Sequence, residues 1–396
     1  MQIVRHSSSR SSGSLLQYRR RTLAFAGVLG LAAAVVALAC EDDPHRRTEP
    51  GKLLGGGGAC SANPGELPAA DCDNSQKSCT LVPGCSIDEA RCGSTATCLP
   101  LGDNKGKDVL DLRIRRLNIA APSALAGDFI QNTVVNSGID LAQPACAENG
   151  KGLFTWILRV DKNAGTLVTG GAPPATDPLG QGFCFASFEL GGTKVQPITA
   201  KIELTGDTFK TVERQNVNIP IFLSEQLESA IILPIRDARI ENVTISQDGN
   251  CIGAFNVAAL DPSCTEDRTL CPKWTTAGAL GGFITLEEAD AVKIRDLGDK
   301  SLCAFLATDS GLVCARDAQG KIVYKGDYCS TDKSPGSCQD SVWLAATFAA
   351  SAAKIFDGKD IVEGCSGAIT SPVDGGSPDA ESDAGGNDAA ADPDAQ

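Results

Sequence analysis

Histidine is nearly absent from this chain of 396 residues: only His6 and His45 occur. Without a histidine in the body of the chain, a Ser-His-Asp or Cys-His site has no general base. Zinc and non-haem iron sites built on histidine lack their ligands for the same reason. The patterns G-x-S-x-G, H-E-x-x-H, G-x-x-x-x-G-K-[ST] and G-x-G-x-x-G are also missing. We therefore expect no catalytic, cofactor-binding or metal-binding residue of these kinds.

Aromatic residues make up only 5% of the chain, which disfavours the ring-lined clefts that bind sugars. Chemistry carried by carboxylates alone still needs no histidine, as in glycoside hydrolysis by two acids about 5–10 Å apart. The densest acidic cluster is Glu287, Glu288 and Asp290. A helix cap already accounts for Glu288, and a solvated helix face accounts for the other two. A carboxylate-based envelope hydrolase is therefore the alternative function, and a non-enzymatic role is favoured.

Basic residues are outnumbered, with 35 Lys and Arg against 49 Asp and Glu, which gives a net charge of −14. Removing the five arginines that precede Cys40 makes the balance −19, from 30 bases and 49 acids. Nucleic-acid binding rests largely on Lys and Arg neutralising phosphates. We therefore expect no nucleic-acid partner.

One long apolar run is present, from Leu23 to Cys40, and it follows three arginines at 19–21. Residues 1–39 contain no acid. A basic segment, an apolar run of this length and then small residues are typical of an export signal, whereas a membrane span prefers about 20 apolar residues. We predict that residues 1–39 are a signal peptide.

The end of this run, Ala37-Leu38-Ala39-Cys40, resembles the lipobox of bacterial lipoproteins, although Ala37 stands where the family prefers leucine. The resemblance implies that Cys40 becomes the mature N-terminus and carries a lipid, so that the membrane is a partner. Two or three acyl chains anchor a protein stably. Ordinary A-x-A cleavage is the other interpretation, and it would leave Cys40 as a plain thiol.

Polar, glycine-rich segments flank the body. Residues 40–59 contain two prolines and a run of four glycines, which predicts a flexible tether behind the anchor. Residues 367–396 are rich in Asp, Ala and Gly and predict a disordered acidic tail. Together with the signal these segments place the body in the cell envelope, lipid-anchored to a membrane and facing the periplasm or the cell surface.

Cysteine is abundant, with 17 residues. No C-x2-C pair occurs, which disfavours zinc, and an oxidising compartment favours disulfides. If Cys40 is lipid-modified, sixteen cysteines remain and can form eight bridges. The predicted disulfide-forming residues are Cys60, Cys72, Cys79, Cys85, Cys92, Cys98, Cys146, Cys184, Cys251, Cys264, Cys271, Cys303, Cys314, Cys329, Cys338 and Cys365.

Six of these cysteines lie between residues 60 and 98, where few apolar residues separate them. Such a segment cannot build a core and is stable only when cross-linked. We therefore predict a small disulfide-rich module over residues 60–105. The sequence leaves its fifteen possible pairings open.

Alternating apolar residues then predict strands over residues 106–250. The alternation in 110–121 shifts phase near Arg115 and Arg116, which indicates a bulge. Apolar residues alternate in 154–160 and, cleanly, in 217–223, and Pro220 places the latter run at a sheet edge or a bulge. Residues 123–136 are expected to form a short helix. The predicted fold class is mainly β, with an antiparallel β-sandwich-like body and a few helices.

The last part of the body, residues 251–366, is predicted to be a disulfide-stapled α+β region. Thr285 and Glu288 form a capping-box pattern for a short helix that ends near Val292. Six alanines between Ser341 and Phe356 predict the strongest helix of the chain. A hairpin is expected near residues 322–324.

Two acidic loops, residues 103–108 and 161–163, are the best calcium candidates. Each is also an ordinary Asx or glycine turn beside a strand, and we favour the turn.

In composition, the cysteine-rich segment, glycine tether and Asp/Ala/Gly tail resemble uncharacterised Cys-rich lipoproteins of myxobacterial type. That resemblance implies no activity. We therefore predict an exported, lipid-anchored binding or scaffold module with a protein or polysaccharide ligand.

Overall fold

The computed structural model describes residues 60–72, 99–127, 130–139, 150–175, 177–222, 230–256 and 274–356. All of them belong to one compact unit, Gly55–Gln396. The predicted signal peptide, tether and acidic tail lie outside the described residues. So does the middle of the predicted cysteine-rich module, residues 73–98.

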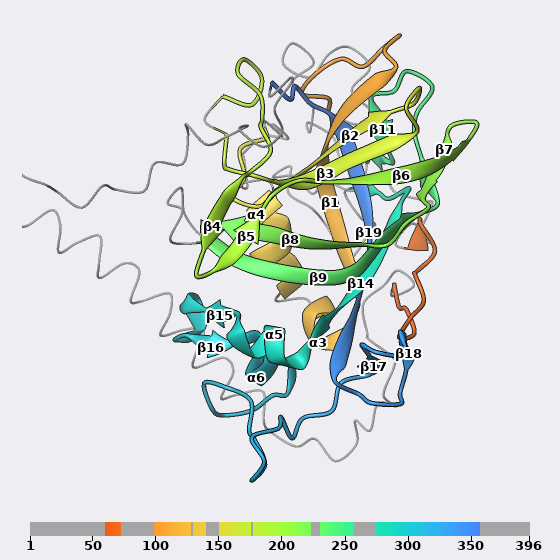
Figure 1. The fold of residues 1–396 in the computed structure, drawn as a ribbon. Helices are drawn as coiled ribbons and strands as arrows, with labels where there is room; N and C mark the ends of the chain where they lie inside the picture. Colours follow the sequence, from red (N-terminus) through yellow and green to blue (C-terminus); the bar gives the residue numbers. More distant parts are fainter. Residues whose placement is uncertain are drawn as a thin grey trace, which may run out of the picture. The chain divides into compact units, whose positions relative to one another are not determined.

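A long antiparallel sheet dominates the fold, as predicted (Figure 1). Its strands follow one another in the order β10-β7-β6-β3-β2-β1-β19-β14-β9-β8. Their bounds are β1 Val109–Ala121, β2 Thr155–Asp161, β3 Thr166–Ala172, β6 Ile198–Thr205, β7 Thr208–Thr211, β8 Gln215–Phe222, β9 Ala230–Glu241, β10 Val243–Thr244, β14 Ala279–Thr285 and β19 Ser341–Ala352.

Shorter strands and helices decorate this sheet. The short strands are β4 Phe188–Leu190, β5 Thr193–Val195, β11 Cys251–Ile252, β12 Ala254–Phe255, β13 Trp274–Thr275, β15 Lys293–Ile294, β16 Lys300–Ser301, β17 Tyr328–Cys329 and β18 Ser334–Pro335. The helices are α3 Ser123–Ala126, a π-helical turn Ile130–Asn136, α4 Ser137–Ile139, α5 Leu286–Ala291, a 3-10 turn Arg295–Leu297 and α6 Leu302–Leu306.

Several strand predictions are confirmed. The register of β1 on β19 shifts between Ile114 and Arg116, where the change of phase indicated a bulge. Strand β8 lies at one end of the sheet and carries Pro220, so the missing N–H of the proline interrupts no central ladder. The turn that joins β6 to β7 contains Gly206 at a φ of 60°, a conformation that glycine adopts without strain.

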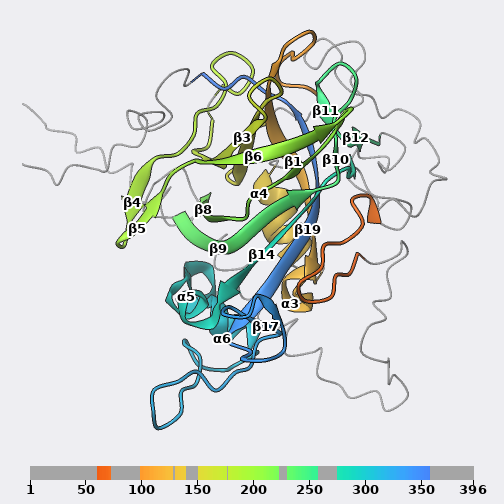
Figure 2. The same ribbon diagram turned by 45° about the vertical axis from the view of Figure 1, so that its right-hand side comes forward.

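The sheet curls until its two ends face each other (Figure 2). Strand β3 then contacts β8, and β7 contacts β9. A Cβ at Gly171 of β3 would lie 2.4 Å from Cδ of Pro220 in β8, so only glycine permits this approach. The Thr211 hydroxyl accepts a hydrogen bond from the Ile240 N–H at 3.1 Å, which ties β7 to β9. Curling therefore wraps the main hydrophobic core inside a single sheet.

The helix predicted between Ser341 and Phe356 is wrong, because residues 341–352 form β19, a central strand between β1 and β14. Every residue of β19 is buried. Its even-numbered residues, such as Leu344 and Phe348, join the inner core, whereas Trp343 and Ala345 join a second cluster on the outer face. The strand is thus covered on both sides, and backbone pairing with two neighbours outweighs the helix propensity of its alanines.

The outer face of β19 is covered by the two described ends of the predicted cysteine-rich module. The indole N–H of Trp343 donates to the backbone oxygen of Glu66 at 2.8 Å, and Leu67 packs on the same cluster. Further along the strand, the Leu101 N–H donates to the Ala352 oxygen at 2.7 Å. These segments therefore form a layer of the body.

The segment predicted to be a helix over 123–136 is broken into three short pieces in the structure: α3, the π-helical turn and α4. Val135 and Ile139 join the inner core. Gln131 accepts a hydrogen bond from the Ile119 N–H at 2.9 Å and donates to the Leu117 oxygen at 2.7 Å. Because β2 pairs only with residues 109–113 of β1, the side chain of Gln131 satisfies backbone groups of β1 beyond that pairing.

Helix α5 begins as predicted. The Thr285 hydroxyl accepts from the Glu288 N–H at 3.2 Å and donates to the Glu288 carboxylate at 2.8 Å. The hairpin expected near residues 322–324 is also present, because Arg316 and Ile322 form a β-bridge.

Candidate functional site

The acidic cluster singled out in the sequence is gathered on one arginine. Arg316 donates to both Glu287 oxygens at 3.0 and 2.8 Å and to Asp290 at 2.9 Å. Arg316 comes from the 314–324 hairpin, and both acids come from α5. This fork stabilises the contact between the helix and the hairpin.

Asp290 is the buried member of the cluster. It also accepts from the Ser301 hydroxyl at 2.7 Å and from the Cys314 N–H at 2.8 Å. Burial alone raises the pKa of this carboxyl, but the hydrogen bonds from Cys314, Ser301 and Arg316 outweigh burial and hold the pKa below its ordinary value. A glycosidase acid needs the opposite shift.

Glu288 lies on another side of α5 and binds Arg236 of β9. The Arg236 Nε donates to it at 2.7 Å. The helix cap and this ion pair together account for the carboxylate. Each of the three candidate acids therefore has a structural partner, and Asp290, the buried one, has a pKa shifted away from that of a general acid.

Both calcium candidates form the turns that we favoured. The Asp161 carboxylate accepts from the N–H groups of Asn163 and Ala164 at 3.0 and 2.8 Å. Asp103 accepts from the Lys105 N–H at 2.9 Å and from the Asn250 amide at 3.2 Å. These oxygens are engaged in Asx-type turns.

Three cysteine pairs form disulfides, and their Cα–Cα distances are those of ordinary bridges. They are Cys60–Cys72 at 5.2 Å, Cys303–Cys314 at 5.7 Å and Cys329–Cys338 at 4.9 Å. Cys184 and Cys251 are disulfide-bonded as well. The remaining predicted cysteines, and Cys40, lie outside the described residues: Cys79, Cys85, Cys92, Cys98, Cys146, Cys264, Cys271 and Cys365.

Two buried arginines of β1 were not recognised as special in the sequence. The guanidinium of Arg113 lies 5.4 Å from the ring centre of Phe183, and that of Arg115 lies 5.5 Å from the ring of Trp274. Arg115 also donates to the Leu99 oxygen at 2.8 Å. These contacts attach the outer segments to the sheet. The pattern Arg-x-Arg in a predicted strand was the signal that could have revealed them.

A buried aspartate, Asp237, joins a second outer segment to the sheet through ion pairs. It lies in β9 with a φ of 54° and pairs with Arg214 at 2.7 Å and Lys333 at 2.8 Å. Burial raises its pKa, but the hydrogen bonds and charges of Lys333 and Arg214 outweigh burial and lower the pKa below its ordinary value. Because Lys333 comes from the Cys329–Cys338 loop, this ion pair fastens the loop to the sheet.

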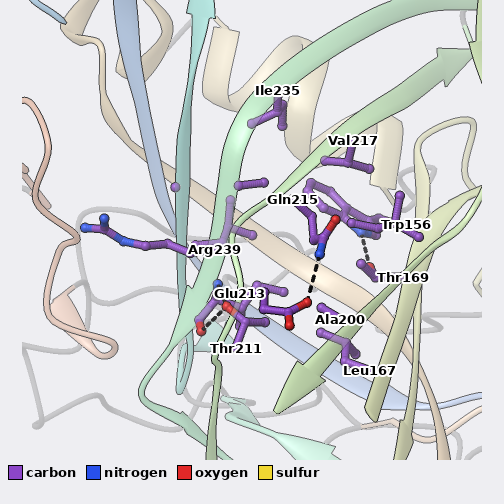
Figure 3. A pocket seen from close by; sticks show the side chains of 15 residues that line it. Trp156, Leu167, Thr169, Ala200, Thr211, Glu213, Gln215, Val217, Ile235 and Arg239 are labelled. Atoms are coloured by element: carbon purple, nitrogen blue, oxygen red, sulfur yellow. Dashed lines mark hydrogen bonds between the residues drawn. The ribbon is translucent and has the colours of Figure 1, made fainter. Parts of the chain in front are cut away.

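A cavity lies between the facing ends of the curled sheet (Figure 3). Its volume is about 420 Å³, open mouth included, and its enclosed part holds only about two water molecules. The walls come from β2, β3, β6 and β7 on one side and from β8, β9 and β14 on the other. The lining residues are Trp156, Leu167, Thr169, Ile198, Ala200, Thr211, Glu213, Gln215, Val217, Ile235, Ala238, Arg239, Ile240, Leu280 and Gly281.

The inner polar groups of this cavity have partners within the protein. The Trp156 indole N–H donates to the Thr169 hydroxyl at 2.7 Å, and that hydroxyl donates to the Ile157 oxygen. The Arg239 guanidinium turns away from the cavity, toward the Trp343 ring and the Gly65 oxygen (Figure 3). At the mouth, the half-exposed Glu213 accepts a long hydrogen bond of 3.4 Å from Gln215.

Among the described residues, no helix has the length and apolarity that crossing a membrane requires. No family model matches the chain, and neither a curated protein nor a solved structure shows a match to it. What this protein does must therefore be argued from its own residues.

Proposed function

We propose that this chain is an exported protein of the cell envelope, lipid-anchored through Cys40, whose disulfide-stapled β body acts as a binding or structural module. The observation that supports export best is the set of bridges in the body. Cys303–Cys314 and Cys329–Cys338 are local, and each closes a loop that carries few core residues. Bridges of this kind form and persist in oxidising compartments, which export would supply.

The body has the construction of a rigid support. Its central strand is buried on both faces, and arginines fasten the outer segments to the sheet. A protein or polysaccharide that binds to such a body meets a surface that is already ordered, so that less entropy is lost on binding. This favours a binding or scaffold role.

The alternative, a carboxylate-based envelope hydrolase, has less support. Glu287, Glu288 and Asp290 are each held in ion pairs with arginine. Such a hydrolase requires two acids, one of which stays protonated near neutral pH.

Lipidation is tested by replacing Cys40 in cells fed a labelled fatty acid. We expect Cys40→Ala to lose the label and to leave the membrane fraction, whereas the neighbouring Glu41→Gln keeps both. A labelled, membrane-bound Cys40→Ala protein would contradict the proposed anchor.

The disulfides are tested separately by thiol titration of the denatured, unreduced mature protein. We expect no free thiol, because lipid modification of Cys40 leaves an even number of cysteines. One thiol per chain would indicate an unmodified Cys40, two would indicate a missing bridge, and several thiols would contradict export into an oxidising compartment. A pull-down from envelope extract with the mature protein then searches for the protein or polysaccharide ligand.

A further inference from the structure

We propose that the cavity between the two ends of the curled sheet is a binding site for a small cationic amphiphile. Its apolar chain inserts beside Trp156, and its amine head is bound at the mouth by Glu213. This goes beyond the proposed function, because the site lies inside the body and does not depend on export or on the anchor.

The cavity exists because the sheet closes on itself without a complete ladder. Strand β8, at one end of the path, pairs with β9, and β10, at the other end, follows β9 after Asn242 and pairs with β7 over two residues. Beyond that short pairing β7 is joined to β9 through the Thr211 side chain, and small residues such as Ala200 and Ala238 leave space there. Filling the space would require only larger side chains, so its presence is a feature of this sequence and not of the fold.

The interior is suited to an apolar group. Leu167, Val217 and Ile235 are buried members of the main core that also line the cavity. The Trp156 N–H donates a hydrogen bond to the Thr169 hydroxyl, so an apolar ligand beside them leaves neither group without a hydrogen-bond partner. A polar group placed there would lose its water without gaining a partner, whereas an alkyl chain gains from leaving water.

The mouth is suited to a cation. Glu213 is 50% exposed, and its charged neighbour, Lys201, lies 3.9 Å away and is 74% exposed. That exposed pair is weak and yields easily to a competing amine. The other charged residue of the lining, Arg239, directs its guanidinium to Trp343. The head of a bound amphiphile therefore meets a carboxylate at the mouth.

The narrow interior limits the ligand to a slender group. Its enclosed part holds only about two water molecules, which suits the end of a linear alkyl chain, with the rest of the chain in the open mouth. A straight-chain alkylamine is the simplest molecule with this shape and charge.

The site is tested with the purified full chain, hexylamine and hexanoate, followed by tryptophan fluorescence and calorimetry. We expect hexylamine to bind saturably and about tenfold more tightly than hexanoate, since Glu213 attracts one head and repels the other. Trp156→Phe should keep the calorimetric binding and lose the fluorescence change, because neither of the other two tryptophans lines the cavity.

Two variants separate the head from the chain. Glu213→Gln should abolish the preference for hexylamine, whereas Glu203→Gln should retain it, because Glu203 is equally exposed in the adjoining hairpin but does not line the cavity. This control also removes the same charge, so general attraction of amines to an acidic protein is accounted for. Ala200→Leu should weaken both ligands at least about tenfold by filling the cavity.

Other results would overturn the proposal. The absence of saturable binding would do so, as would full binding by Ala200→Leu or a preference for hexylamine that survives in Glu213→Gln. A fluorescence change retained in Trp156→Phe would place the ligand elsewhere. If Ala200→Leu does not fold, the exposed Glu213→Gln and Glu203→Gln pair still decides the outcome. None of these measurements involves Cys40, so failure here is distinct from failure of the proposed anchor.

Discussion

Strands β6 and β19 lie in the same sheet but differ in how many of their faces meet water. In β6, buried Ala200 and Ile202 alternate with exposed Thr199, Lys201 and Glu203. In β19, all twelve residues are buried. One face of β19 belongs to the inner core, and the other is covered by residues from 60–72 and 99–104. A strand at the centre of two layers needs small or apolar side chains on both sides, and alanine fits where those layers approach closely.

The largest test of this difference places the same charge in both strands. Thr347→Lys should destabilise the protein by more than about 4 kcal/mol or prevent folding, because Thr347 is fully buried and the ammonium would lack water and a partner. Thr199→Lys in β6 should change the free energy of unfolding by less than about 0.5 kcal/mol. Urea unfolding of both variants measures the contrast, and equal effects would disprove it.

The second test asks whether the start of β19 depends on the neighbouring disulfide. Cys329→Ala with Cys338→Ala should lower the unfolding free energy by about 2–4 kcal/mol. Because Tyr328 pairs with Ser341, amide exchange should quicken at the start of β19. Removing the comparable Cys303–Cys314 bridge should cost a similar free energy without that local effect. Faster amide exchange at Ser341 in both double variants would show that the start of β19 does not depend specifically on the Cys329–Cys338 bridge.

The third test loosens the same loop through its ion pair. Asp237→Asn should lower the unfolding free energy by about 1–3 kcal/mol near neutral pH, since Arg214 and Lys333 lose their charged partner. The folded state holds the pKa of Asp237 below its ordinary value of 3.8. Its contribution is therefore present above that value and is lost as pH falls through the folded pKa. The free energies of unfolding of the two proteins should differ at pH 7 and approach each other as pH falls below 3.8.

The smallest effect has the opposite sign. Asp327 accepts from the Trp343 N–H of β19 at 2.8 Å, and burial raises its pKa above the ordinary value of 3.8. Asp327→Asn keeps an accepting oxygen and removes a desolvated charge, so it should stabilise the protein by up to about 1 kcal/mol at pH 7. A raised pKa means that the wild type gains stability as pH falls through the folded value, and the two proteins should then converge. Destabilisation at pH 7 would contradict this reasoning.

Elements of two kinds were predictable from the sequence. In some, the interacting residues are close together along the chain, and in others, one face of the strand meets water. Residues 198–205 alternate because the opposite faces of β6 meet core and solvent. The α5 cap needs only Thr285 and the residue three positions later. The bulge in β1 was visible because the phase of its apolar residues shifts within the strand.

The acidic cluster shows the limit of this reasoning at the candidate site. Sequence placed Glu287, Glu288 and Asp290 together because they are neighbours on α5. It could not show that Arg316 and Arg236 arrive from separate elements to bind them. The cavity was even less predictable from the sequence, since its lining comes from residues between 156 and 281 that meet only when the sheet curls.

The mainly β class, the turns, the helix cap and the scarcity of histidine follow from the amino-acid sequence alone, because each depends on local spacing or on residue counts. That Ser341–Ala352 is a strand depends on tertiary contacts, since an alanine-rich run has a high helix propensity in isolation. Between β1 and β14 its backbone gains two ladders, and layers on both faces bury its side chains. Those gains come from residues far away along the chain, and no local pattern records them.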